Sequence, residues 1–230
     1  MLDFVYATLY KMKFFRSTKG SGANHFIQRT EWDLVDEDVG MRGTPVGFDL
    51  NQDGHCDLVA ANADGDIEYY LFEKIGTNGV EYSESIKLKD KEGNDIKIAW
   101  GRPAVMDVDL DGVTDLLFGS YVPHGSVGEG VQLYKNTAVS SLNPFTYKKQ
   151  SSWPLSSACT SGWCWAATGH FNDDNILDLM INNKMFKHNS DGTFTDQTDE
   201  WGNGLYHLTN DRKFRDNGLG AFEFQFSQIT

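Results

Sequence analysis

The sequence predicts an all-β protein built from tandem repeats, and three observations support this prediction. An acidic segment occurs three times, with first positions 58 residues apart (49 to 107) and then 63 apart (107 to 170). Each copy runs directly into four or five apolar residues bounded by turn residues, which is typical of a buried strand. No sustained helical periodicity appears in the chain. A repeat of about 60 residues with three or four antiparallel strands fits a β-propeller blade.

The strands are expected in the same order in every unit. The apolar runs after the acidic segments are Leu58–Ala61, Leu116–Gly119 and Leu179–Asn182. A glycine-containing turn follows, and then an aromatic strand such as Ile67–Phe72. A last strand is expected to begin near Phe26, Tyr82, Phe145 or Phe194.

A second marker supports the repeat independently. The segment Phe14–Thr18 matches Leu133–Thr137, and the segments Leu71–Lys74 and Met185–His188 are further copies. We therefore expect one β-propeller domain over 1–230, partial or small. Its repeat units are three complete ones at about 36–95, 96–155 and 156–201, with partial units at 1–35 and 202–230. Either the first 30 and last 30 residues complete a fourth blade, or the chain is part of a larger propeller, completed by further repeats or by a neighbouring subunit. The second is favoured, because open blades would expose unpaired strand edges.

Composition limits the possible partners. The 230 residues are 40% hydrophobic and 13% aromatic, as in a globular protein, and carry a formal net charge of -13. This charge argues against nucleic acid and against an anionic membrane surface, since both need a positive face. An acidic balance is also a common aid to solubility. No stretch approaches the roughly 20 apolar residues of a transmembrane helix, and no signal peptide is visible.

The spacing within the acidic segments predicts calcium sites. Calcium prefers six to eight oxygen ligands, and side chains at positions 1, 3 and 5 of a curled loop converge on one point. Glycine at position 6 permits the turn, position 7 supplies a backbone carbonyl, and an Asp at position 9 completes the shell. Loop one supplies Asp49, Asn51, Asp53, the carbonyl of His55, and Asp57; loop two supplies Asp107, Asp109, Asp111, the carbonyl of Val113, and Asp115.

Loop three departs from this pattern. Its expected ligands are Asn172, Asp174, the carbonyl of Ile176, and Asp178, but His170 replaces the first Asp and Asn175 replaces the glycine. Asn tolerates the left-handed conformation, so the turn is expected to survive. Counting carboxylates at the ligand positions predicts that affinity falls from loop two to loop one to loop three, which is expected to be weak or empty. The alternative for any one loop is an Asp-rich turn satisfied by its own backbone hydrogen bonds.

An EF-hand is excluded. That motif needs a bidentate Glu at position 12 and a helix on either side. Position 12 is Ala60, Phe118 or Ile181 in the three loops, and every loop runs into a strand.

The sequence does not decide whether two of the three cysteines form a disulfide bond. Cys159 and Cys164 enclose four residues in a turn-like stretch, where they either close a small disulfide loop or remain unpaired thiols in a buried strand and turn. A disulfide would imply an oxidising compartment. Cys56 is expected to be a small buried side chain.

The loops resemble the FG-GAP, or VCBS, repeats of integrin-α-type propellers. The matching pattern, D-x-[DN]-x-D-G-x-x-D-L before a strand, is complete at 49–58 and 107–116 and imperfect at 170–179. The pair Phe118-Gly119 stands where the family's FG often falls. The resemblance implies structural calcium, an extracellular or cell-surface location, and binding surfaces on the propeller faces.

The expected function is therefore a non-catalytic, calcium-stabilised binding, adhesion or structural module with a protein or carbohydrate ligand. Aromatic residues in the loops between blades are candidate sugar contacts, namely Trp100, Tyr121, Trp163 and Trp165, although packing between blades is the favoured explanation for any one of them. The alternatives are the propeller portion of a secreted glycan- or lipid-cleaving enzyme, or a structural subunit of a larger surface assembly. No nucleophile-elbow, zinc-protease or P-loop motif is present.

Overall fold

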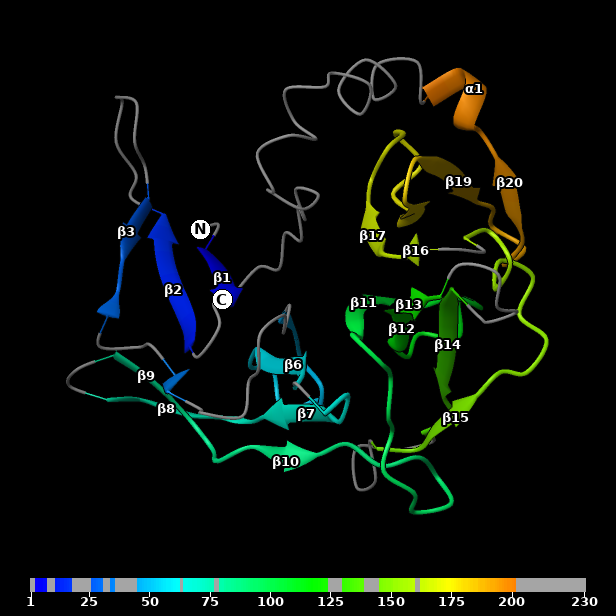
Figure 1. Ribbon diagram of the computed structural model, residues 1–230. Helices are drawn as coiled ribbons and strands as arrows, with labels where there is room; N and C mark the ends of the chain where they lie inside the picture. The colour runs from blue at the N-terminus through cyan, green and yellow to red at the C-terminus, as the bar shows by residue number, and fades with distance from the viewer. Residues whose placement is uncertain are drawn as a thin grey trace.

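The computed structural model is all-β, which confirms the predicted class (Figure 1). It describes residues 3–7, 11–17, 26–30, 34–35, 45–62, 64–76, 79–123, 130–138, 145–159 and 162–201. Within these residues the only helix is the single turn α1 (Thr198–Trp201). The expected partial unit at 202–230 lies outside them. No described helix is long and apolar enough to cross a membrane.

Most strands belong to four antiparallel sheets of four strands each. Sheet I contains β1 (Asp3–Ala7), β2 (Lys11–Ser17), β3 (Phe26–Gln28) and β4 (Leu34–Val35). Sheet II contains β5 (Val46–Phe48), β6 (Asp57–Ala61), β7 (Ile67–Tyr70) and β10 (Ile86–Lys87). Sheet III contains β11 (Arg102–Met106), β12 (Asp115–Gly119), β14 (Val131–Asn136) and β15 (Tyr147–Lys149). Sheet IV contains β17 (Ala166–Gly169), β18 (Asp178–Ile181), β19 (Lys184–His188) and β20 (Phe194–Asp196).

Sheets II, III and IV share one topology, in which each strand pairs with the next strand of its own sheet along the chain. Two smaller ladders interrupt this order. The hairpin of β8 (Phe72–Gly76) and β9 (Gly79–Tyr82) lies between β7 and β10, and β13 (Tyr121–Val122) pairs with β16 (Gly162–Trp163). Because the β8–β9 hairpin comes before it, the last strand of sheet II begins at Ile86 and not near Tyr82 as expected.

The sheets pack face to face in chain order, and the alternation of side chains along each second strand explains how. On β12, Leu116 and Phe118 pack with sheet II, whereas Leu117 packs with sheet IV. On β6, Leu58 packs with sheet I and Val59 with sheet III. Because successive side chains of a strand point to opposite faces, a strand covered on both faces must be apolar throughout. This is why each acidic loop is followed by a continuous apolar run.

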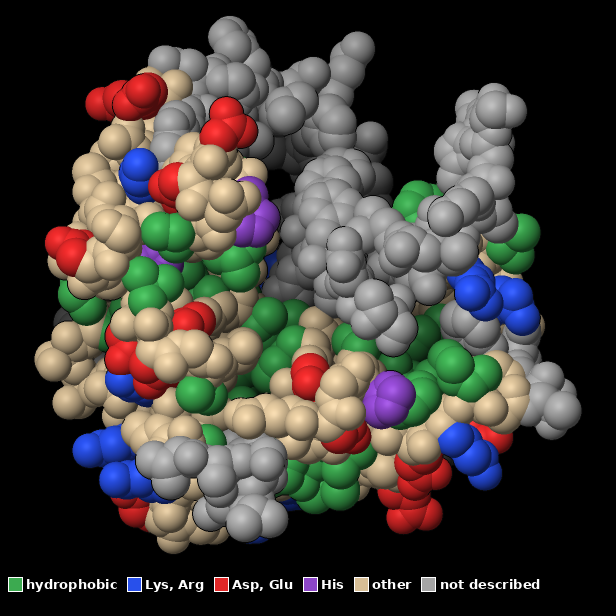
Figure 2. Space-filling model, turned by 180° about the vertical axis from the view of Figure 1, so that it is seen from behind, with side chains coloured by type: hydrophobic (Ala, Val, Ile, Leu, Met, Phe, Trp, Pro, Cys, Tyr) green, Lys and Arg blue, Asp and Glu red, His purple; other side chains and the backbone are tan. Residues whose placement is uncertain are grey.

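The four sheets follow one another along an arc from sheet I to sheet IV (Figure 1). The described residues do not close into a ring, so they do not fix a number of blades. From behind, hydrophobic side chains gather in the middle of the molecule, while acidic and basic side chains are scattered around them (Figure 2).

The strand register corrects one detail of the repeat. Leu58 pairs with Tyr70, Leu116 with Tyr134, and Leu179 with Phe186. The equivalents of Leu133–Asn136 are therefore Met185–His188, as expected, but also Tyr69–Phe72 in place of Leu71–Lys74. A shift of two residues keeps every side chain on its own face, so the aromatic run Ile67–Phe72 matches the pattern in either register.

Candidate metal centre

The ninth residue of each loop is a buried aspartate that fastens the loop to its sheet. Asp57, Asp115 and Asp178 are fully buried, at 0% exposure. Each accepts a hydrogen bond from the amide of the second loop residue and another from the amide two positions after the residue that pairs with the leucine following the aspartate, which is the last residue of β14 or β19 or the first residue of β8. The donors to Asp57 are the amides of Leu50 (3.0 Å) and Phe72 (2.8 Å). Those to Asp115 are Val108 (3.0 Å) and Asn136 (2.7 Å), and those to Asp178 are Phe171 (3.1 Å) and His188 (3.0 Å).

Loop two gathers its carboxylates most closely. Ligand oxygens of Asp107, Asp109 and Asp115 all lie within 4.8 Å of one another, the one such group of acidic, His or Cys side chains in the part of the chain that the structure describes. Asp107 accepts hydrogen bonds from the amides of Asp111 (3.0 Å) and Gly112 (2.7 Å). Gly112 has a φ of 88°, the left-handed conformation for which position 6 was expected to need glycine.

Loop one repeats this backbone arrangement with fewer carboxylates. Asp49 accepts hydrogen bonds from the amides of Asp53 (3.0 Å) and Gly54 (2.9 Å). The amide group of Asn51 donates to Asp53 over 2.8 Å. The loop therefore has the same curl, with an amide oxygen at position 3 where loop two has a carboxylate.

The seventh positions are also equivalent in the three loops. The amide of each residue donates to the side chain at position 5; these residues are His55 (2.8 Å), Val113 (2.9 Å) and Ile176 (3.0 Å). All three loops thus form the same turn, whether or not they can hold a cation.

Loop three differs from the other two because a histidine side chain bonds to its seventh-position carbonyl. Nδ1 of His170 lies 3.2 Å from the carbonyl oxygen of Ile176, the seventh-position ligand that was expected to face a cation. Asp174 pairs with Lys187 at 3.2 Å, and Asn172 donates to Asp178 at 3.1 Å. Asn175 has a φ of 61°, so the turn does survive without glycine.

Lys135 belongs to the centre, although the sequence did not identify it. Its Nζ bonds to Asp109 and lies 3.7 Å from Asp111, and the hydrogen bond with Asp109 raises the pKa of the lysine. Lys135 follows Tyr134 directly on β14, the position that Lys187 holds on β19 and Leu71 holds after β7. The strand register would have revealed the role of Lys135, because it places this residue beside the acidic loop of its own sheet. The ranking of the loops by carboxylates alone omits this positive charge, which loop one lacks.

Burial makes the charged state of these sites costly. The pKa of Asp115 is raised to about 7, chiefly by desolvation and also by the neighbouring carboxylates of Asp109 and Asp111, although the two backbone amides act to lower it. Burial also raises the pKa of Asp57. A divalent cation would favour the charged form of both residues.

His188 couples loop two to the neighbouring sheet. Its ring is fully buried, with Nε2 3.0 Å from the carbonyl oxygen of Val108 and Nδ1 3.2 Å from that of Leu177. The ring stacks on Phe194, with centroids 4.6 Å apart. The two hydrogen bonds of His188 thus join loops two and three. A cleft of about 400 Å³ lies beside them, and its lining includes Asp109, Lys135 and Phe194.

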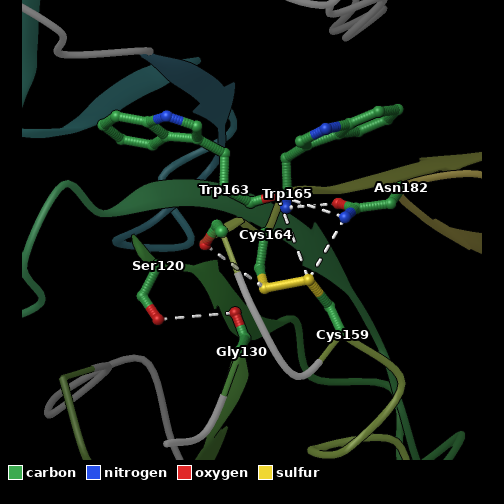
Figure 3. Close-up of a disulfide and its surroundings, with 8 residues drawn as sticks. Ser120, Gly130, Cys159, Trp163, Cys164, Trp165 and Asn182 are labelled. Atoms are coloured by element: carbon green, nitrogen blue, oxygen red, sulfur yellow. Dashed lines mark hydrogen bonds between the residues drawn. A yellow bond between two sulfur atoms is a disulfide. The ribbon is translucent and has the colours of Figure 1, made fainter. Parts of the chain in front are cut away.

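The opposite end of sheet III carries a disulfide. Cys159 and Cys164 are bonded to each other, and Cys56 is buried and free. Asn182 donates from Nδ2 to Sγ of Cys159 and to the carbonyl oxygen of Trp163, each over 3.1 Å (Figure 3). Gly119 and Gly130 lie so close to the segment from Cys159 to Trp165 that neither has space for a Cβ atom.

Comparison with known proteins agrees with the loop geometry. Residues 49–118 match the FG-GAP-like repeat, from the first residue of loop one to Phe118 on β12. No curated protein sequence matches the chain. Loops one and two both lie in the matched segment, and the third copy of the loop has the same buried aspartate and the same turn. The chain therefore contains an FG-GAP-like repeat at residues 49–118.

Proposed function

We propose that the chain is a calcium-stabilised β-propeller module that binds a protein or carbohydrate partner, without catalysis, outside the cell or on its surface. The observation that carries this proposal is the convergence of Asp107, Asp109 and Asp115 at the head of a buried strand. Three carboxylates at this distance suit a hard cation with oxygen ligands. In loop two, Asp107, Asp109, Asp111 and Asp115 would supply carboxylates and Val113 a carbonyl; in loop one, Asp49, Asn51, Asp53, His55 and Asp57 hold the equivalent positions.

The sheets support the propeller part of the proposal. A propeller blade is a four-stranded sheet packed face to face between its neighbours, as sheets II and III are. Among the described residues, the first and the last sheet of the arc each pack against one neighbouring sheet, which favours completion by further repeats or by another subunit. The disulfide supports an oxidising compartment, and therefore an extracellular or surface location.

A calcium titration followed by thermal unfolding tests the metal sites. A ligand at 100 times its Kd stabilises the folded state by about 2.7 kcal/mol, a shift of several degrees in the melting temperature. Asp109→Ala is expected to remove much of this shift, because it removes one of the three converging carboxylates of loop two. His170→Ala, in the loop whose ligand positions are already bonded, is expected to change it little. A full calcium response in Asp109→Ala would rule out the ligand assignment of loop two.

Lys135 gives a second prediction. Lys135→Met removes the positive charge beside Asp109 and Asp111, so loop two is expected to bind calcium about tenfold more tightly, a change of about 1.4 kcal/mol. Isothermal titration calorimetry measures the change, with Lys187→Met in loop three as the matched control. That control is expected to create no tight site, because His170 still bonds to the seventh-position carbonyl. Unchanged or weaker binding by Lys135→Met would show that the lysine does not compete with the cation.

A further inference from the structure

Three large aromatic side chains form an exposed surface that the metal sites do not explain. Trp100, Tyr121 and Trp163 are 38%, 38% and 37% exposed. Their rings contact one another, with centroids 5.8 Å apart between Trp100 and Trp163 and 4.8 Å apart between Tyr121 and Trp163. We call these three residues the aromatic patch. Three rings in contact at the surface offer a flat apolar platform for a small ligand.

The patch lies at the end of the sheets opposite to the acidic loops. On β11, Arg102 pairs with Gly119 at one end and Met106 pairs with Asp115, the last residue of loop two, at the other. Trp100 precedes β11 and Tyr121 follows β12, so both stand at the first of these ends. Trp163 precedes β17, which leads away from it toward loop three. The patch is therefore separate from the proposed calcium sites.

The backbone holds the patch rigidly. Tyr121 pairs with Trp163 in the ladder of β13 and β16, and the Tyr121 amide donates to the carbonyl of Ala99 over 3.3 Å. The disulfide lies beneath Trp163, and the indoles of Trp163 and Trp165 both point away from it (Figure 3). Trp100 has a φ of 58°, a strained conformation for a bulky residue. A surface fixed in this way loses little entropy when it binds a ligand.

The exposed area of the patch and the charge beside it favour a sugar over a protein partner or a cationic ligand. An aromatic side chain has roughly 150–250 Å² of surface, so a patch a little over one-third exposed offers about 250 Å². A stable protein partner would cover about 800 Å² on each side, whereas one or two sugar rings fit the smaller area. The apolar C–H face of a pyranose lies flat on an aromatic ring while its hydroxyls stay in water. The guanidinium of Arg102, 5.7 Å from the Trp163 ring, disfavours a cationic ligand.

We propose that the aromatic patch binds a pyranose residue of a neutral or acidic glycan by stacking. The proposal rests on the function proposed above, a non-catalytic binding module, and assigns its ligand class and the face that takes it. The glycan stacks against the patch, and the guanidinium of Arg102 lies beside the Trp163 ring.

A glycan array of neutral, carboxylate-bearing and amino sugars tests the patch. The wild-type protein is expected to retain neutral or acidic glycans, and Trp163→Ala and Tyr121→Ala to lose at least tenfold in apparent affinity. Trp163→Phe, which keeps an aromatic ring, is expected to keep part of the binding if Trp163→Ala does not fold. Phe26→Ala is the matched control, because Phe26 is an aromatic residue on sheet I that is somewhat more exposed than the patch, at 45%. This variant is expected to bind glycan as the wild type does.

The two proposals fail in different ways. Asp109→Ala is expected to lose the loop-two part of the calcium response yet keep glycan binding below its melting temperature, while Tyr121→Ala is expected to keep the full calcium response and lose glycan binding. A wild-type protein that retains no glycan, patch variants that bind as wild type does, or a preference for amino sugars would overturn the stacking site and leave the calcium proposal intact. Glycan binding through the patch with no calcium response would overturn the metal sites alone.

Discussion

Asp115→Ala is expected to lower the free energy of unfolding by about 4 kcal/mol, because it leaves two buried amides without an acceptor. The carboxylate is fully buried and accepts hydrogen bonds from Val108 and Asn136. An unsatisfied buried donor costs about 1–3 kcal/mol, and the variant also loses a side chain from the core. Urea unfolding with a chelator present measures this structural part alone. A loss below about 1 kcal/mol would show that the carboxylate does not fasten the loop to the sheet.

The pH dependence of stability distinguishes the hydrogen bonds of Asp115 from the effect of its charge. Burial raises the pKa of Asp115 to about 7, so the metal-free folded protein keeps this proton at pH values where the unfolded chain has lost it. For a carboxyl group whose folded pKa is raised, stability is lost as the pH rises, here between about 4 and 7. Asp115→Asn cannot titrate, so its stability is expected to fall less across this window. Equal slopes for wild type and Asp115→Asn in chelator would contradict the assignment.

Gly119→Ala is expected to destabilise the protein by 3 kcal/mol or more, of the order found for severe overpacking. An added Cβ would lie 2.4 Å from the carbonyl oxygen of Cys164 and 2.6 Å from Cα of Trp165. These are backbone atoms held by the disulfide, so they cannot move aside as a flexible side chain would. Thermal unfolding and the rate of disulfide reduction are expected to show the loss together, because the same contact holds the Cys159–Trp165 segment in place.

Gly169→Ala is the control for this prediction. Gly169 also lies in a strand, on β17, but an added Cβ would meet only the ring of Phe171, at 3.2 Å. A side chain can yield by a few tenths of an ångström, so the effect is expected to stay below about 1 kcal/mol. Similar losses in the two variants would mean that the backbone approach at Gly119 is not what requires glycine there.

Much of the fold followed from local patterns. The apolar runs after the acidic loops predicted strands β6, β12 and β18 closely, because a strand buried on both faces shows this in its own residues. The left-handed turn at Asn175 in loop three was also predictable, since it depends on that residue alone. The pairing of Tyr70 with Leu58 was not, because a shift of two residues preserves the facing of every side chain.

The sequence by itself determined the repeat, the all-β class and the identity of the loop side chains, because spacing along a tight turn brings those residues together without distant contacts. Only the tertiary structure showed that Lys135 reaches Asp109 from another strand, that His170 bonds within loop three, and that Trp100 meets Trp163. Contacts between strands depend on register and on the packing of sheets. Charge balance at the metal centre and the shape of the opposite surface are therefore properties of the folded chain.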